Sequence, residues 1–163
     1  MKTGFIIVMG VAGSGKTTVG ELLAQRLGWN FYDADAFHPA ENIAKMANGT
    51  PLNDADRAPW LAALHALIST SLKENRPAVL ACSALKESYR QELLRGNEGV
   101  QFVYLKGRYN LIWSRISSRK DHYMKPQMLQ SQFEALEEPA DAWTFDVALP
   151  VSEIVKGIVQ LVE

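Results

Sequence analysis

The chain has 163 residues, of which 47% are hydrophobic and 21% are charged. This balance excludes a disordered chain, and the length suits one domain that spans residues 1–163. The formal net charge of -1 leaves no basic excess for binding a nucleic acid or an anionic membrane surface. No apolar stretch approaches membrane-spanning length, and the single cysteine, Cys82, permits no internal disulfide. We therefore expect a soluble cytoplasmic protein.

Apolar runs alternate with helical patterns along most of the chain. In chain order, they predict a strand at Phe5–Met9, a helix at Lys16–Leu27, a strand at Asn30–Asp33, a helix at Pro39–Ala47, a longer helix that Asn53 or Asp54 caps and that extends to Leu72, a strand at Ala78–Cys82, a helix at Lys86–Leu94, a strand at Gln101–Lys106, helices at Tyr109–Arg119 and Pro126–Leu136, a strand at Phe145–Leu149 and a last helix capped by Ser152. Apolar strands separated by helices indicate an α/β fold, with a five-stranded parallel sheet and helices on both faces.

The segment between the first strand and the first helix matches the phosphate-loop pattern Gly-x-x-x-x-Gly-Lys-Thr. Its glycines allow backbone N–H groups to turn toward phosphate oxygens, and the helix that follows presents its positive end. Lys16 is expected to reach the β and γ phosphates, and the Thr17 hydroxyl to ligate Mg²⁺. The residues expected to bind the nucleotide are Gly10, Ala12, Gly13, Ser14, Gly15, Lys16, Thr17 and the adjacent Thr18, which lies outside the pattern.

Two acids, Asp33 and Asp35, follow the second strand, at the edge of the sheet where parallel strands form a ligand crevice. One residue separates them at the strand end, and we expect their side chains to point to opposite sides. One can hold magnesium through water while the other accepts a proton from an acceptor hydroxyl. The chain lacks both the Asn-Lys-x-Asp stretch of GTPases and an acid at the end of the third strand, where ATPase motors carry one. This pattern favours phosphate transfer to a small acceptor.

Beyond the loop, the chain resembles the small kinases related to adenylate and shikimate kinase, and among them the gluconokinase family. The matching residues span nearly the whole chain: Met9–Thr17, Phe31–Pro39, Asn42, Lys45, Met46, Pro51–Asp54, Asp56, Arg57, Pro59–Leu61, Cys82–Lys86, Tyr89, Arg90, Leu105–Gly107, Arg115, Arg119, His122, Gln132, Phe133, Leu136, Glu137 and Pro139. The resemblance implies a P-loop kinase fold, ATP and Mg²⁺ as cofactors, and transfer to the 6-hydroxyl of D-gluconate. It also implies a homodimer.

For the acceptor, the resemblance implies that Asp35 orients the hydroxyl and that Asp33 positions magnesium through water. A carboxylate needs a positive fork, for which Arg57 and Arg90 are candidates, and Lys86 can add a point charge. Arg57 has an alternative as a helix-start residue paired with Asp54 or Asp56. His38 follows the acids and is expected to bond an acceptor hydroxyl.

A basic segment near residue 119 resembles the lid of such kinases, at about residues 119–127, and a substrate-binding segment is expected at about 36–75. The resemblance assigns Arg119 to the transferring phosphate and Arg115 to the adenine, although a solvated basic face is the alternative. Two alternatives to gluconate phosphorylation stay open: another small-metabolite kinase, such as a shikimate-like enzyme, and a nucleotide-dependent binding module without catalysis.

Overall fold

A computed structural model describes residues 2–118 and 126–163. In chain order, the elements are β1 (Phe5–Met9), α1 (Lys16–Leu27), β2 (Asn30–Asp33), the short 3-10 helix η1 (Ala34–Phe37), α2 (Ala40–Ala47), α3 (Asp54–Lys73), β3 (Ala78–Ala81), α4 (Glu87–Leu94), β4 (Val100–Lys106), α5 (Tyr109–Ser117), α6 (Pro126–Ala135), β5 (Trp143–Asp146) and α7 (Val151–Val162). No helix in these two ranges is long and apolar enough to cross a membrane.

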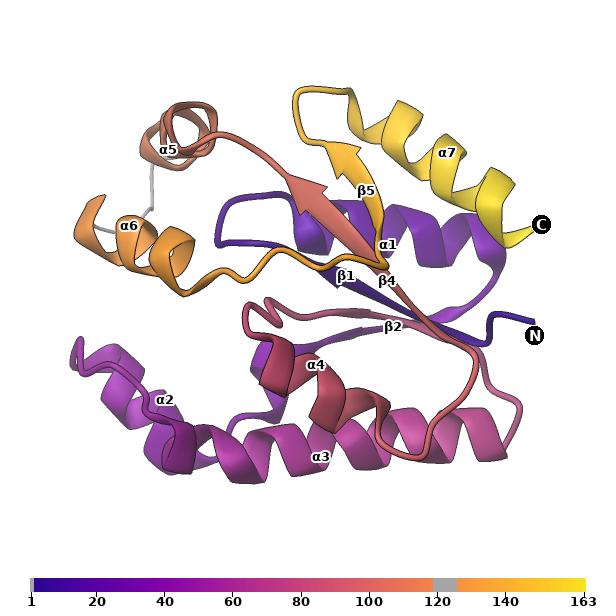
Figure 1. Ribbon diagram of the computed structural model, residues 1–163, viewed down its shortest axis with the longest axis horizontal. Coiled ribbons are helices and arrows are strands. Elements are labelled where there is room, and N and C mark those ends of the chain that lie inside the picture. The colour runs from indigo at the N-terminus through magenta and orange to yellow at the C-terminus, as the bar shows by residue number, and fades with distance from the viewer. Residues whose placement is uncertain (1, 119–125) are drawn as a thin grey trace.

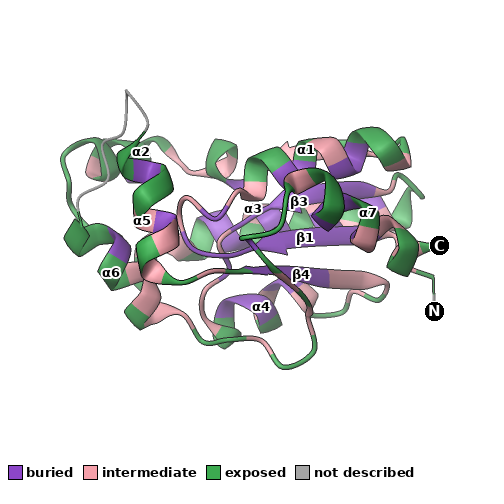
Figure 2. Ribbon diagram, turned by 90° about the horizontal axis from the view of Figure 1, so that it is seen from above, coloured by how far each residue is buried: buried purple, intermediate pink, exposed green. Residues whose placement is uncertain are grey.

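The strands form one parallel sheet in the order β2-β3-β1-β4-β5, with helices on both faces (Figure 1). One face packs against α3 and α4, with Trp60, Leu64 and Ile68 from α3 in its core. The other packs against α1, α5 and α7. The buried residues concentrate in the central strands between these layers (Figure 2). The expected P-loop kinase architecture is therefore confirmed.

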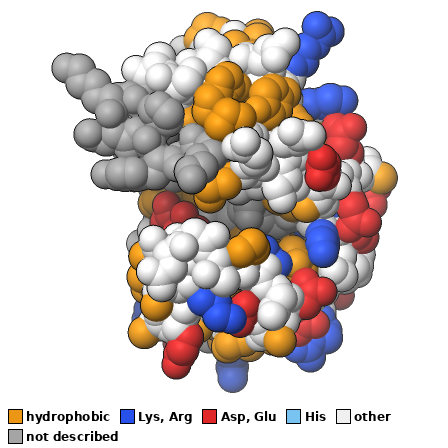
Figure 3. Space-filling view, turned by 90° about the vertical axis from the view of Figure 1, so that its left-hand side faces the viewer, with side chains coloured by type: hydrophobic (Ala, Val, Ile, Leu, Met, Phe, Trp, Pro, Cys, Tyr) orange, Lys and Arg blue, Asp and Glu red, His pale blue; other side chains and the backbone are white. Residues whose placement is uncertain are grey.

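The register of the sheet determines what meets at its carboxyl edge. Asp33 pairs with Ala81, and Ala81 pairs with Val8, two residues before Gly10. The acids after β2 and the loop after β1 therefore lie beside the same central strand. This face of the molecule is hollowed between an upper and a lower part (Figure 3).

Several expected element boundaries differ from the structure by one or two residues, and the last strand and the last helix show the instructive differences. The last strand was expected at Phe145–Leu149, but β5 ends at Asp146, because the Ala148 N–H donates to the Asp146 carboxylate and the Leu149 N–H to the Asp146 carbonyl, so the chain turns there. Val147 is nevertheless only 1% exposed, so its apolar character reflects the core rather than a strand. The last helix begins after Pro150, and Ser152 lies inside it. Asn53 caps α3 in a reciprocal capping box with Asp56.

Candidate active site

The loop between β1 and α1 has the backbone shape that a phosphate loop requires. Gly13 and Gly15 adopt φ of +79° and +97°, in the left-handed region that favours glycine. The Ser14 hydroxyl is buried and has no hydrogen-bond partner among the described residues. A buried hydroxyl without a partner is costly unless a ligand supplies one. The loop therefore fits an anion with several oxygens, as the nucleotide phosphates are.

Lys16 extends from the start of α1 along the inside of this loop, where its ammonium donates to the Val11 carbonyl at 3.1 Å. Burial lowers the pKa of Lys16, whereas the negative charges of Asp35 and Asp33 raise it. A cation partly withdrawn from water interacts strongly with an incoming phosphate.

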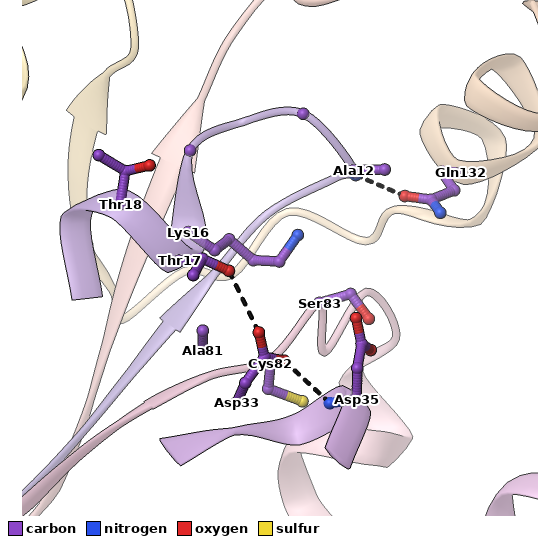
Figure 4. A pocket seen from close by; sticks show the side chains of 12 residues that line it. Ala12, Lys16, Thr17, Thr18, Asp33, Asp35, Ala81, Cys82, Ser83 and Gln132 are labelled. Carbon is purple, nitrogen blue, oxygen red and sulfur yellow. Dashed lines mark hydrogen bonds between the residues drawn. The ribbon is translucent and has the colours of Figure 1, made fainter. Parts of the chain in front are cut away.

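Asp33 ends β2 and is held from two sides. The Thr17 hydroxyl donates to Asp33 Oδ2 at 3.2 Å, and the Asp35 backbone N–H donates to Asp33 Oδ1 at 3.0 Å (Figure 4). The expectation that Asp33 and Asp35 point to opposite sides is wrong, because residues two apart in a strand share a face, and the chain here passes directly from the strand into η1 at Ala34. Both acids line the same cavity.

The pairing of a threonine hydroxyl with a carboxylate fits Mg²⁺, which prefers oxygen ligands and retains several waters. The described residues contain no group of three or more His, Cys, Asp or Glu placed to hold a metal. Thr17 and Asp33 would therefore hold the ion together with water and phosphate oxygens, rather than as a complete protein cage.

A cavity of about 340 Å³ joins the loop to the acids. Gln132 on α6 closes its far side, and its Oε1 accepts from the Ala12 backbone N–H at 2.6 Å (Figure 4). Sequence reasoning assigned Gln132 no role, since its position in a helical pattern does not reveal that α6 reaches the loop. Burial raises the pKa of the Cys82 thiol to about 12, so this residue stays protonated. The cavity is lined by Ala12, Gly13, Gly15, Lys16, Thr17, Thr18, Asp33, Asp35, Ala81, Cys82, Ser83 and Gln132.

His38 lies just past η1 and is held in one orientation. Its ring stacks on Trp60, with 4.5 Å between the ring centroids and 8° between the planes, and its Nδ1 lies 3.1 Å from the Asn42 amide nitrogen. Desolvation lowers the pKa of His38, while the charge of Asp35 raises it and that of Arg57 lowers it. The His38 ring is therefore close enough to both Asp35 and Arg57 for their charges to affect its pKa.

Arg57 and Lys86 belong to one cluster around Tyr89. Both cations lie over the Tyr89 ring, at 5.6 and 5.7 Å from its centroid, and Arg57 also donates to the Tyr89 hydroxyl at 3.1 Å. That hydroxyl donates to Asp54 at 2.7 Å. Asp54 is exposed and lies 3.9 Å from Arg57 and 4.0 Å from Lys86. The alternative pairing of Arg57 with Asp54 is thus present, but as a long contact at the surface.

Arg90 is not available as a fork for a ligand carboxylate, and that prediction is wrong. The residue is 2% exposed, and all five of its N–H groups donate within the protein. Two donate to Glu87 and three to backbone carbonyls, including that of Ala84 at 2.7 Å. Ala84 has a left-handed φ of 44°, unusual for a residue other than glycine. Arg90 therefore shapes the segment after β3.

Arg115 lies at a second cavity, of about 370 Å³, behind the phosphate loop. Thr18 and the chain from Val147 to Val151 line the same space. The structure thus brings Arg115 to the nucleotide loop but does not test its expected contact with adenine. Arg119 and most of the expected lid lie outside the described residues.

Comparisons with known proteins agree with this arrangement. A model of the shikimate kinase family matches residues 12–160. A mouse protein named probable gluconokinase is 47% identical over 84% of each chain, and the thermoresistant gluconokinase of Escherichia coli K12 is 42% identical over 96% of this chain and 92% of its own. A solved gluconokinase from Sinorhizobium meliloti 1021 has a TM-score of 0.87 at 43% identity, covering 98% of this chain and 93% of its own. The chain belongs to the gluconokinase family, within the P-loop kinases related to shikimate kinase.

Proposed function

We propose that this protein is a gluconokinase that transfers the γ-phosphate of ATP to the 6-hydroxyl of D-gluconate, giving 6-phospho-D-gluconate and ADP. The observation that carries the proposal is that the nucleotide loop and an acceptor-side carboxylate, Asp35, line one cavity. The identities of 42% and 47% to proteins named gluconokinase support this acceptor. A shikimate-like acceptor draws support from the name of the matching family model, but the relatives above 40% identity are named gluconokinases.

On the nucleotide side, the loop amides, the Ser14 hydroxyl and Lys16 bind the phosphates and stabilise the charge that develops during transfer. Gly10, Ala12, Gly13 and Gly15 contribute backbone rather than side chains. Thr17 would hold Mg²⁺ directly and Asp33 through water, and the ion would supply neutralisation of phosphate charge there. Arg115 is proposed at the adenine, and Arg119 at the transferring phosphate.

On the acceptor side, Asp35 orients the 6-hydroxyl and takes its proton late in the reaction. The hydroxyl oxygen forms a bond to the γ-phosphorus while the bond from that phosphorus to the β–γ bridging oxygen breaks, so ADP leaves. The structure favours Asp35 over Asp33 as the proton acceptor, because Asp33 is already held by Thr17 and by the Asp35 backbone. Among the described residues, Asp35 takes part only as the backbone donor to Asp33, and its carboxylate accepts no side-chain hydrogen bond.

For the carboxylate of gluconate, we propose Arg57 and Lys86. Tyr89 supports both cations. Asp54 is the negatively charged residue near Arg57 and Lys86. A hydrogen bond from the Tyr89 hydroxyl and the charge of Lys86 lower the pKa of Asp54. Since Asp54 is exposed, its long contacts with the cations are worth little and a substrate carboxylate can replace them.

The proposal is tested by measuring ADP release with gluconate, shikimate and other sugar acids, and by locating the phosphate on the product by NMR. We expect release with gluconate and a phosphate on the terminal oxygen. Lys16→Ala should lower kcat by about 1,000-fold, while Lys156→Ala, at an exposed position of α7, should not. Activity with shikimate but not with gluconate would overturn the proposal, and no dependence on any hydroxylated acid would favour a binding module.

The remaining proposals concern the enzyme in solution. We propose that it is cytoplasmic, acts as a homodimer and requires Mg²⁺. Light scattering measures the dimer, and loss of activity with EDTA followed by its recovery with Mg²⁺ measures the metal requirement.

A further inference from the structure

The hydrogen bonds of Asn42 define which ring nitrogen of His38 carries the proton. Asn42 is 2% exposed, and its side-chain amide nitrogen lies 2.8 Å from the backbone carbonyl of Asp56. A carbonyl oxygen can only accept, so the group that faces it must be the NH₂ of Asn42. The orientation of the amide is therefore fixed by the protein itself.

The same NH₂ group lies 3.1 Å from His38 Nδ1. It has two hydrogens, one for the Asp56 carbonyl and one for the ring, so Nδ1 must accept. In a neutral imidazole the proton then lies on Nε2. No described residue forms a hydrogen bond with Nε2, which leaves this N–H free for a ligand.

The surrounding contacts hold the ring in this orientation, because a half-turn would place Cδ2 where Nδ1 lies and the Asn42 NH₂ would lose its acceptor. Trp60 covers one ring face, and its own indole N–H donates to the Ala34 carbonyl at 2.8 Å. Asn42 is held on α2, while Lys45 on the same helix forms an ion pair of 2.7 Å with Asp56. This network joins η1, α2 and the first turn of α3.

We propose that Asn42 is a positioning residue that holds His38 in the Nε2–H tautomer, so that His38 serves the acceptor as a hydrogen-bond donor and not as a base. The proposal rests on the proposed function, because the ligand of Nε2–H is a hydroxyl oxygen of the polyol acid. Two hydrogen-bond roles are thereby separated: Asp35 accepts a proton and His38 donates a hydrogen bond.

Electrostatics agree with a neutral ring. A proton on Nδ1 would face the NH₂ of Asn42, and the charge of Arg57 adds to desolvation in lowering the pKa of His38. Asp35 opposes these effects without reversing them.

The tautomer is tested on the free protein by ¹⁵N NMR of labelled histidines, with His38→Gln to assign the signals. We expect a bare Nδ1 and a protonated Nε2 between pH 6 and 8. In Asn42→Asp a carboxylate replaces the donor and should draw the proton to Nδ1. Asn48→Asp adds the same charge at the end of α2 and should leave the His38 signals unchanged. A proton on Nδ1 in the unmodified protein would overturn the proposal.

The donor role is tested by comparing two substitutions at His38 in the gluconate assay. A glutamine amide can reproduce the Nε2–H group, whereas the shorter asparagine cannot reach that position. We expect kcat/KM for gluconate to be about 2- to 10-fold higher in His38→Gln than in His38→Asn, as one hydrogen bond is worth. Equal values, or the loss of an acidic limb of the pH profile in His38→Gln, would overturn it. Failure of the unmodified enzyme to use gluconate would instead refute the proposed function, while the NMR experiment would still decide the tautomer of His38.

Discussion

The nucleotide side and the acceptor side of the cavity are built in different ways. The nucleotide side is one continuous segment, Gly10–Thr17, whose backbone presents the binding groups. The acceptor side is a set of side chains from η1, α2, α3 and the start of α4, connected by hydrogen bonds over 14 to 35 positions of the chain. Phosphates are alike in every nucleotide and suit a fixed backbone site, while an individual acceptor needs groups that can vary independently.

If Asp35 belongs to the acceptor side, Asp35→Asn should separate turnover from nucleotide binding. Removal of the proton acceptor should lower kcat by about 100-fold or more, with ATP affinity nearly unchanged. Steady-state kinetics and calorimetry with ATP measure the two quantities. Equal losses in both would place Asp35 on the nucleotide side. The matched variant Asp33→Asn should instead raise the Mg²⁺ concentration needed for half-maximal rate.

Arg90 and Arg57 both touch the acceptor side, but only the first is part of its framework. Arg90→Ala should lower the free energy of unfolding by about 3 kcal/mol, because buried carbonyls lose their donors. Urea denaturation measures this loss. Arg76→Ala, at an exposed ion pair with Glu74, should change it by less than about 1 kcal/mol. A stable Arg90→Ala protein with a raised KM for gluconate would instead support Arg90 as a ligand of the substrate carboxylate.

For Arg57→Ala we expect the reverse pattern, with a KM for gluconate about 10- to 100-fold higher and little loss of stability, as expected for one charged hydrogen bond. The KM for ATP should stay within about twofold. An equal increase in both constants would mean that Arg57 acts on the whole cavity rather than on the acceptor.

The smallest expected effect concerns stability at mildly acidic pH. The folded protein lowers the pKa of His38 below its ordinary value of 6.5. Above pH 6.5 the lowered pKa has no effect on the free energy of unfolding. As the pH falls from 6.5 toward the pKa of the folded protein, the unfolded chain binds the proton more readily than the folded protein does. The free energy of unfolding therefore declines over that range. His38→Gln should therefore lose less stability between pH 7 and 5 than the unmodified protein, and His65→Gln should not share this gain. Thermal unfolding across that range measures the difference.

The nucleotide side was predictable because its chemistry depends on the spacing of adjacent residues. The positions of most strands and helices were predictable as well, since apolar periodicity marks them directly. The direction of Asp35 was predicted wrongly, because residues two apart in a strand share a face and because η1, which has no clear signal in the sequence, follows Asp33 directly. The prediction for Arg90 was wrong, because a cation in an amphipathic helix gives the same sequence pattern whether it is exposed or buried. Asn42, Tyr89 and Gln132 were noted only as matching residues, because their contacts join elements far apart in the chain.

The left-handed backbone at Ala84 has a consequence for how variation at this site is interpreted. Arg90 holds the Ala84 carbonyl, and Ser83 beside it lines the cavity. A substitution of Arg90 would therefore release a bent segment next to the bound substrates, although no atom of Arg90 takes part in the reaction. In a genetic screen such variants would be scored with the catalytic ones, and only the amount of folded protein would tell the two groups apart.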